Sequence, residues 1–105
     1  MSTTVVILTK NEVTGVRKIL PQLNLDWADE WIVMDGSSND GTIEEAKKLN
    51  FDVIQQNGKG AGNAAREGVH HSHSENILFF HPDGNCKPEY IPKLIKKMDE
   101  ENYQI

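Results

Sequence analysis

The chain has 105 residues, enough for one small domain, and its 11 basic and 16 acidic side chains give a formal net charge of −5. This balance argues against a nucleic-acid or anionic-membrane partner held by bulk charge. The single cysteine, Cys86, cannot form an internal disulfide, and the longest early apolar run, residues 5–8, is too short for a signal-peptide core or a membrane span, so we expect a cytoplasmic domain with no nucleic-acid partner and no transmembrane segment.

Short β-rich runs alternate with helical stretches from the start of the chain. Residues 4–9 form a continuous β-branched and apolar run, which predicts a strand buried on both faces. Apolar residues then keep helical spacing from residue 13 to residue 23, although Pro21 should end or kink that helix. Residues 31–34 predict a second strand.

The rest of the chain repeats this alternation. Residues 36–41 form a turn cluster, and we expect Thr42 to cap the helix that follows it. Pro92 fits best in the opening turn of the last helix, because a deeper position would remove a helical hydrogen bond. The remaining predicted elements are two strands at residues 51–54 and 77–80 and two helices at residues 61–69 and 91–98.

Strand–helix alternation repeated four times predicts an α/β fold, a mostly parallel sheet of four strands with flanking helices and right-handed crossovers. Every loop that follows a strand then opens at the same carboxyl edge of the sheet. Ligands of such sheets bind at that edge, where the strand order reverses. We therefore expect the chemistry to lie in the four loops at residues 9–12, 35–40, 57–62 and 81–85.

The fourth of these loops carries three candidate metal ligands at alternating positions, His81, Asp83 and Asn85. Alternate positions of an extended segment point to one side. An imidazole nitrogen, a carboxylate and an amide oxygen could there share one divalent ion with ligand phosphates. The other interpretation is a simple turn, because Pro-Asp-Gly-Asn is ordinary turn chemistry.

The second and third loops also allow two interpretations each. Asp35 directly follows an apolar strand, where its carboxylate could accept hydrogen bonds from a base or ribose, or cap the turn amides two and three residues further on. The glycine-rich residues 57–62 could cradle phosphates with backbone amides, with Lys59 and Arg66 as nearby cations, or serve packing around small residues. Their spacing fits neither a P-loop nor a dinucleotide fingerprint.

Several motifs occur in an order that resembles a known family. The first strand ends in Leu-Thr-Lys-Asn-Glu (residues 8–12), similar to Pro-Thr-Tyr-Asn-Glu, and the second in Met-Asp-Gly-Ser-Ser-Asn-Asp-Gly-Thr (residues 34–42), similar to Val-Asp-Asp/Gly-Gly-Ser-x-Asp-Gly-Thr. The segment from Gly58 to Gly68 is similar to a Gly-Lys-Gly-x-Ala segment that ends in Arg-x-Gly. Residues 81–85 stand in place of an Asp-x-Asp metal motif, and Pro-Glu-Tyr-Ile-Pro follows at 88–92. The chain thus resembles the amino-terminal part of family 2 glycosyltransferases, a group that includes dolichyl-phosphate mannose synthases.

This resemblance implies the nucleotide-binding half of a nucleotide-diphospho-sugar transferase (GT-A) fold. The implied partner is a nucleotide-diphosphate sugar, and the implied reaction is inverting transfer of the sugar to an acceptor. A divalent metal, Mn²⁺ or Mg²⁺, would neutralise the diphosphate leaving group. The residues that the resemblance assigns to the nucleotide sugar are Thr9, Asn11, Glu12, Asp35, Lys59 and Arg66. Those that it assigns to the metal are His81, Asp83 and Asn85.

The chain departs from the family pattern in two respects. Lys10 replaces a frequent aromatic residue, Gly36 a frequent aspartate, and His81 the first aspartate of the metal motif, which removes one negative charge. The family's later strands, acceptor region and catalytic base have no counterpart here, so we expect residues 1–105 to form a single truncated domain without a catalytic residue of its own. The alternative is a non-catalytic module for binding or assembly, a homo-oligomer formed through exposed sheet edges.

Overall fold

The computed structural model describes residues 2–101 and confirms the α/β fold. Its four strands are parallel and pair in the order β3-β2-β1-β4. No strand end differs by more than one residue from the prediction. The strands are β1 (Thr3–Thr9), β2 (Glu30–Asp35), β3 (Asp52–Gln55) and β4 (Asn76–Phe80).

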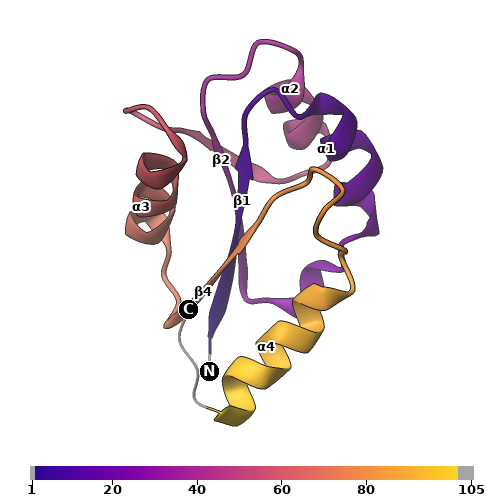
Figure 1. Ribbon diagram of the computed structural model, residues 1–105, viewed down its shortest axis with the longest axis vertical. Helices are drawn as coiled ribbons and strands as arrows, with labels where there is room; N and C mark the ends of the chain where they lie inside the picture. The colour runs from indigo at the N-terminus through magenta and orange to yellow at the C-terminus, as the bar shows by residue number, and fades with distance from the viewer. Residues whose placement is uncertain (1, 102–105) are drawn as a thin grey trace.

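Helices cover both faces of this sheet (Figure 1). The helix α3 lies alone on one face, and α1, α2 and α4 lie on the other. None of the helices in residues 2–101 combines the length and apolar character needed to cross a lipid bilayer. The helices are α1 (Val13–Ile19), α2 (Thr42–Lys48), α3 (Ala61–His71) and α4 (Tyr90–Glu101), and two short 3₁₀ turns, η1 (Leu20–Gln22) and η2 (Leu25–Trp27), connect α1 to β2.

The central strand β1 supplies core side chains to both faces of the sheet. Val5 and Ile7 belong to the same apolar cluster as Ile91 of α4. Val6 points the opposite way, as alternation along a strand requires, and packs with Ala64 of α3. All three β1 side chains are fully buried, which confirms the prediction of a strand buried on both faces.

The strand order reverses between β1 and β4. From β1 the chain steps outward to β2 and then β3, through α1 and α2 on one face. The helix α3 then carries it back across the other face, so that β4 pairs with the free side of β1. Crossovers on opposite faces thus bring β2 and β4 to the two sides of β1, and such a reversal of strand order is where α/β sheets open a ligand crevice.

The predicted helix ends differ in how well they agree with the structure. The helix α1 stops before Pro21, which lies in η1, and Pro92 lies in the first turn of α4, as expected. The prediction that Thr42 caps α2 is wrong, because Gly41 is the cap, at φ 98°, and Thr42 is the first helical residue. The Thr42 hydroxyl instead accepts a hydrogen bond from the amide of Glu12 at 2.9 Å, which links α2 to the first loop.

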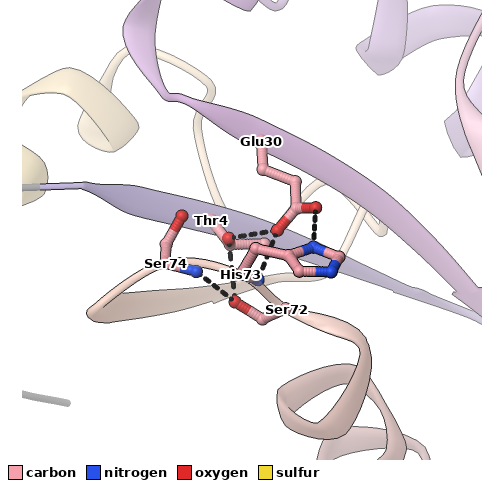
Figure 2. Close-up of polar contacts among 5 residues, drawn as sticks. All are labelled: Thr4, Glu30, Ser72, His73 and Ser74. Atoms are coloured by element: carbon pink, nitrogen blue, oxygen red, sulfur yellow. Dashed lines mark hydrogen bonds and ion pairs between the residues drawn. The ribbon is translucent and has the colours of Figure 1, made fainter.

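At the amino-terminal edge of the sheet, Glu30 joins β1 and β2 to the segment that follows α3 (Figure 2). Its Oε1 accepts hydrogen bonds from the Thr4 hydroxyl at 2.7 Å and from the His73 amide at 2.9 Å, and its Oε2 lies 2.9 Å from His73 Nδ1. The Ser72 hydroxyl donates to Thr4 Oγ1 at 2.9 Å. The hydrogen bond with the His73 ring is the main cause that lowers the pKa of Glu30 to about 2.

Gly15 lets α1 touch the loop that follows β4. A Cβ atom at this position would stand 1.7 Å from the carbonyl oxygen of Pro82, far inside any contact distance. The helix therefore requires glycine here for packing, since φ at this position is not in the left-handed region. The contact places the loop at residues 81–85 directly against α1.

We predict that Gly15→Ala lowers the free energy of unfolding by about 1–3 kcal/mol, the usual cost of overpacking. Alanine at an open helical site has the opposite effect, a gain of about 0.5–1 kcal/mol. Gly62→Ala in α3 is the matched control, because nothing lies within 4 Å of the added Cβ. Urea unfolding measures both variants, and a gain of stability at Gly15 equal to that at Gly62 would contradict the contact.

We also predict that Glu30 makes stability depend on pH in the acid range. Its pKa is about 2 in the folded chain against 4.5 for the unperturbed group, so its contribution is complete above pH 4.5 and is lost as the pH falls toward 2. The stability difference between wild type and Glu30→Gln should therefore shrink over that range in denaturant titrations. The exposed neighbour Glu75 provides the control Glu75→Gln, and a difference at Glu30 that stays constant with pH would refute the prediction.

Candidate functional site

The loops at the carboxyl edge of the sheet enclose a cavity of about 700 Å³. This volume lies in the range usual for small-molecule sites. All four strand ends contribute to it, which confirms the prediction that the four loops open at the same edge of the sheet. The lining residues are Leu8, Thr9, Lys10, Glu12, Gly36, Ser37, Gln56, Asn57, Gly58, Lys59, Gly60, Ala61, Ala64, His81 and Pro82.

Some of the predicted site residues line this cavity, and the others lie outside its lining. Thr9, Glu12, Lys59 and His81 line it. Arg66 lies in a separate depression on α3, beside His70 and His71. The other predicted site residues outside the cavity lining are Asn11, Asp35, Asp83 and Asn85. A ligand role for each of the nine stays a prediction, and the local geometry gives the structural role of several.

Asp35 is fully buried at the end of β2 and accepts three hydrogen bonds. The hydroxyls of Thr9 and Ser38 donate to Oδ1 at 2.6 and 2.7 Å, and the Ser38 amide donates to Oδ2 at 2.7 Å. A buried carboxylate requires such donors, because it has left water without a counter-ion. The structure therefore shows the capping arrangement for Asp35, at Ser38, and joins the ends of β1 and β2 through it.

Further hydrogen bonds link the first loop to the second. Asn11, at φ 52°, donates its amide to Ser38 Oγ at 2.8 Å and accepts the Asn39 amide on Oδ1 at 2.9 Å. Asp40 accepts the first amide of α1 at 3.2 Å and the Thr42 hydroxyl, and this hydroxyl is the main cause that lowers the pKa of Asp40. These contacts make the two loops one unit, with the Asn11 side chain engaged inside it.

Two lining residues, Lys10 and Gln56, were not among the predicted site residues. Lys10 Nζ donates to the carbonyl oxygens of Gly36 at 2.7 Å and Ser37 at 3.2 Å, so it joins the first loop to the second from the cavity side. Gln56 follows β3 directly, and its amide nitrogen lies 3.0 Å from where a Cβ of Gly36 would be. The position of Gln56 at a strand end was the signal that could have identified it.

Glu67 of α3 anchors the start of the glycine-rich loop. Its carboxylate accepts the amides of Asn57, at 2.9 and 3.1 Å, and Gly58, at 3.3 Å, and also the side-chain amide of Asn63. These bonds, that of Asn57 first, lower the pKa of Glu67. Two of the amides expected to cradle phosphate are therefore already hydrogen-bonded, and Lys59 is the cation that this loop brings to the cavity.

The fourth loop is a turn in which Asp83 Oδ1 accepts the amide of Asn85 at 2.9 Å and Gly84 has φ 88°. The other Asp83 oxygen and the His81 imidazole have no hydrogen-bond partner within residues 2–101. Over the same residues, no three His, Cys, Asp or Glu side chains gather as a metal centre. The loop thus fits a divalent cation only as a partial ligand set, which phosphate oxygens and water would have to complete.

The sequence of this chain is similar to those of known glycosyltransferases. The family model for glycosyl transferase family 2 matches residues 4–105. Glycosyltransferase AglJ from Haloferax volcanii is 29% identical over 93 residues, which are 88% of this chain and 31% of that protein.

Solved structures show the same fold. Glucosyl-3-phosphoglycerate synthase from Mycobacterium tuberculosis, crystallised with Mn²⁺, UDP-glucose and phosphoglyceric acid, superposes with a TM-score of 0.80 at 23% identity over 92% of this chain and 39% of that one. TarS 1–349 from S. aureus superposes with a TM-score of 0.76 at 20% identity over 97% of this chain and 33% of that one. The chain therefore spans between about 30 and 40% of the length of these relatives.

We predict that Asp35→Asn lowers the free energy of unfolding by about 2–3 kcal/mol, because an amide replaces one charged acceptor oxygen with a donor among hydroxyl and amide donors. Asp52→Asn is the matched control, since Asp52 is exposed at the start of β3 and should shift stability by less than about 0.5 kcal/mol. Chemical denaturation measures both. Equal small effects at the two positions would contradict the capping role of Asp35.

Proposed function

The chain belongs to glycosyl transferase family 2, and we propose that it binds a nucleotide-diphosphate sugar in the cavity at the carboxyl edge of its sheet. The observation that carries this proposal is the convergence of all four strand-end loops on one cavity next to the strand-order reversal. The neighbour crystallised with UDP-glucose and Mn²⁺ supports the ligand class. The dolichyl-phosphate mannose synthase subtype stays a prediction.

The proposal divides the ligand between two parts of the cavity. The nucleoside lies against the ends of β1, β2 and β3, where Thr9 and Glu12 line the wall. Asn11 and Asp35 contribute to this part of the site indirectly, because their hydrogen bonds fix the positions of the first two loops. Lys59 offers the ligand phosphates a cation from the glycine-rich loop. Arg66 is the weakest phosphate candidate, because it lies outside the lining.

The diphosphate lies toward the fourth loop in this proposal. His81, the free oxygen of Asp83 and the side-chain oxygen of Asn85 would hold a divalent cation, Mn²⁺ or Mg²⁺. When bound, the cation supplies charge neutralisation for the diphosphate leaving group. One carboxylate and one imidazole are few protein ligands, which is the usual situation for a cation shared with substrate phosphates.

The activity of the whole protein is also a proposal, namely inverting transfer of the sugar to an acceptor. No residue of this chain is assigned as the catalytic base. We propose residues 1–105 as a single nucleotide-sugar-binding domain, which by itself is incomplete for catalysis. We further propose a cytoplasmic location and no nucleic-acid partner, in keeping with the net charge of −5.

One observation favours a second candidate, a non-catalytic module of the same fold. Within the described residues the fourth loop offers only His81 and Asp83 as strong metal ligands, and one Asp83 oxygen already caps a turn. Such a module would use the fold for binding or assembly, with a second copy covering the outer edges of β3 and β4. Failure to bind any nucleoside diphosphate with Mn²⁺ would favour it.

We predict that Asp83→Ala removes the Mn²⁺-dependent part of nucleoside-diphosphate binding, a loss of tenfold or more in affinity for roughly one charged ligand interaction. Stability should fall by less than about 1 kcal/mol, because the residue is exposed and makes one turn hydrogen bond. Isothermal calorimetry with UDP or GDP, in the presence and absence of Mn²⁺, measures the effect.

The control for this experiment is Asp52→Ala, an exposed aspartate at the opposite edge of the sheet. It should leave both affinities unchanged. Equal Mn²⁺ enhancement in wild type and Asp83→Ala would remove Asp83 from the metal site. A large fall in the melting temperature of Asp83→Ala would identify the residue as structural instead.

A further inference from the structure

The wall of the cavity beneath Gly36 carries a side-chain donor without a partner. Gln56 is half-buried, and its Nε2 lies 3.0 Å from the position that a Cβ of Gly36 would take. Both residues line the cavity. Nothing in residues 2–101 accepts a hydrogen bond from Gln56 Nε2, although the Oε1 of the same amide accepts one from Asn63 Nδ2 at 2.9 Å.

The orientation of the Gln56 amide is set by a chain of hydrogen bonds that ends at Glu67. A carboxylate can only accept, so Asn63 must turn its NH₂ group toward Glu67. The same NH₂ group donates to Gln56 Oε1, which must therefore be the oxygen side of that amide. Gln56 is left with its NH₂ group toward Gly36 and the cavity.

The charge at the end of this chain is stable at neutral pH. The Asn57 amide, followed by the Gly58 amide and the Asn63 side chain, lowers the pKa of Glu67 below its usual value. The Glu67 carboxylate is therefore ionised at neutral pH and can only accept hydrogen bonds. The hydrogen bonds that Asn63 donates to Glu67 and to Gln56 thus fix Gln56 as a hydrogen-bond donor toward the cavity.

We propose that Gln56 is a specificity-determining residue that selects nucleobases with a carbonyl oxygen at pyrimidine position 4 or purine position 6 over those with an amine at that position. Uracil and guanine present such an oxygen at O4 and O6, whereas cytosine and adenine present NH₂ groups at N4 and N6. Two donors facing each other leave both unsatisfied, so the bases with an amine at N4 or N6 bind less tightly. Glu67 and Asn63 are positioning residues in this account. The inference rests on the proposed nucleotide binding, since it concerns the base of the same ligand.

The test is the affinity of UDP, CDP, GDP and ADP for the whole chain, measured by calorimetry with Mn²⁺. Wild type should prefer UDP over CDP and GDP over ADP by roughly tenfold, about the effect of one hydrogen bond kept or lost. Gln56→Glu replaces the donor with an acceptor and should reverse both preferences. Glu67→Gln gives Asn63 a partner that both donates and accepts, so the two ratios should move toward one.

The neighbouring glutamine supplies a matched control. Gln55 is exposed and precedes Gln56 in the chain, so Gln55→Glu introduces the same charge next to the site without altering its wall. It should leave both ratios at their wild-type values. A merely structural role of Gln56 or Glu67 would weaken all four ligands equally and leave the ratios unchanged.

The outcomes separate this inference from the proposed function. Binding of all four ligands with ratios that Gln56→Glu does not change overturns the role of Gln56 and leaves nucleotide binding standing. Ratios shifted equally by Gln55→Glu would assign the effect to charge alone and also overturn it. No binding of any of the four to wild type overturns both proposals.

Discussion

The carboxylate of Asp35 is the constraint on which the binding edge of this sheet depends. It is fully buried at the end of β2, and an ionised group in that position is tolerated only when donors surround it. Thr9 at the end of β1 and Ser38 in the next loop supply those donors. The bonds from Asn11 to the second loop then extend the same connection outward, so that the first two loops act as one wall of the cavity.

The acidic side chains near the cavity fall into two kinds. Asp35, Asp40 and Glu67 accept backbone amides and side-chain donors, and so they fix the positions of the loops. Glu12 lines the cavity, and Asp83 keeps one oxygen without a partner within the described chain, so these two have charge to offer a ligand or a cation. One set of carboxylates therefore fixes the loops, and another offers negative charge to a ligand or cation. Substitutions in the first set should lower stability, and substitutions in the second set should lower binding.

Much of the fold could be predicted from the sequence, because burial on both faces leaves a continuous apolar run that marks a strand. The location of the cavity also followed, since parallel strands place their following loops at one edge. The roles of single polar residues did not follow. Asp35 and Asp83 each allowed a binding and a capping interpretation, and the choice depends on donors that only the folded loops bring within reach.

The residues that escaped prediction depend on contacts between distant parts of the chain. Gly15 is required because the carbonyl oxygen of Pro82, 67 residues later, packs directly against it. The orientation of the Gln56 side-chain amide is set, through Asn63, by the carboxylate of Glu67, 11 residues further along the chain. Side chains connect the first loop to the second and the third loop to α3, whereas the fourth loop has its contact with α1 and one internal turn bond. The proposed nucleoside end of the cavity is thus preorganised, and the proposed diphosphate end relies on its cation and ligand for its final order, at the cost in binding free energy that such ordering carries.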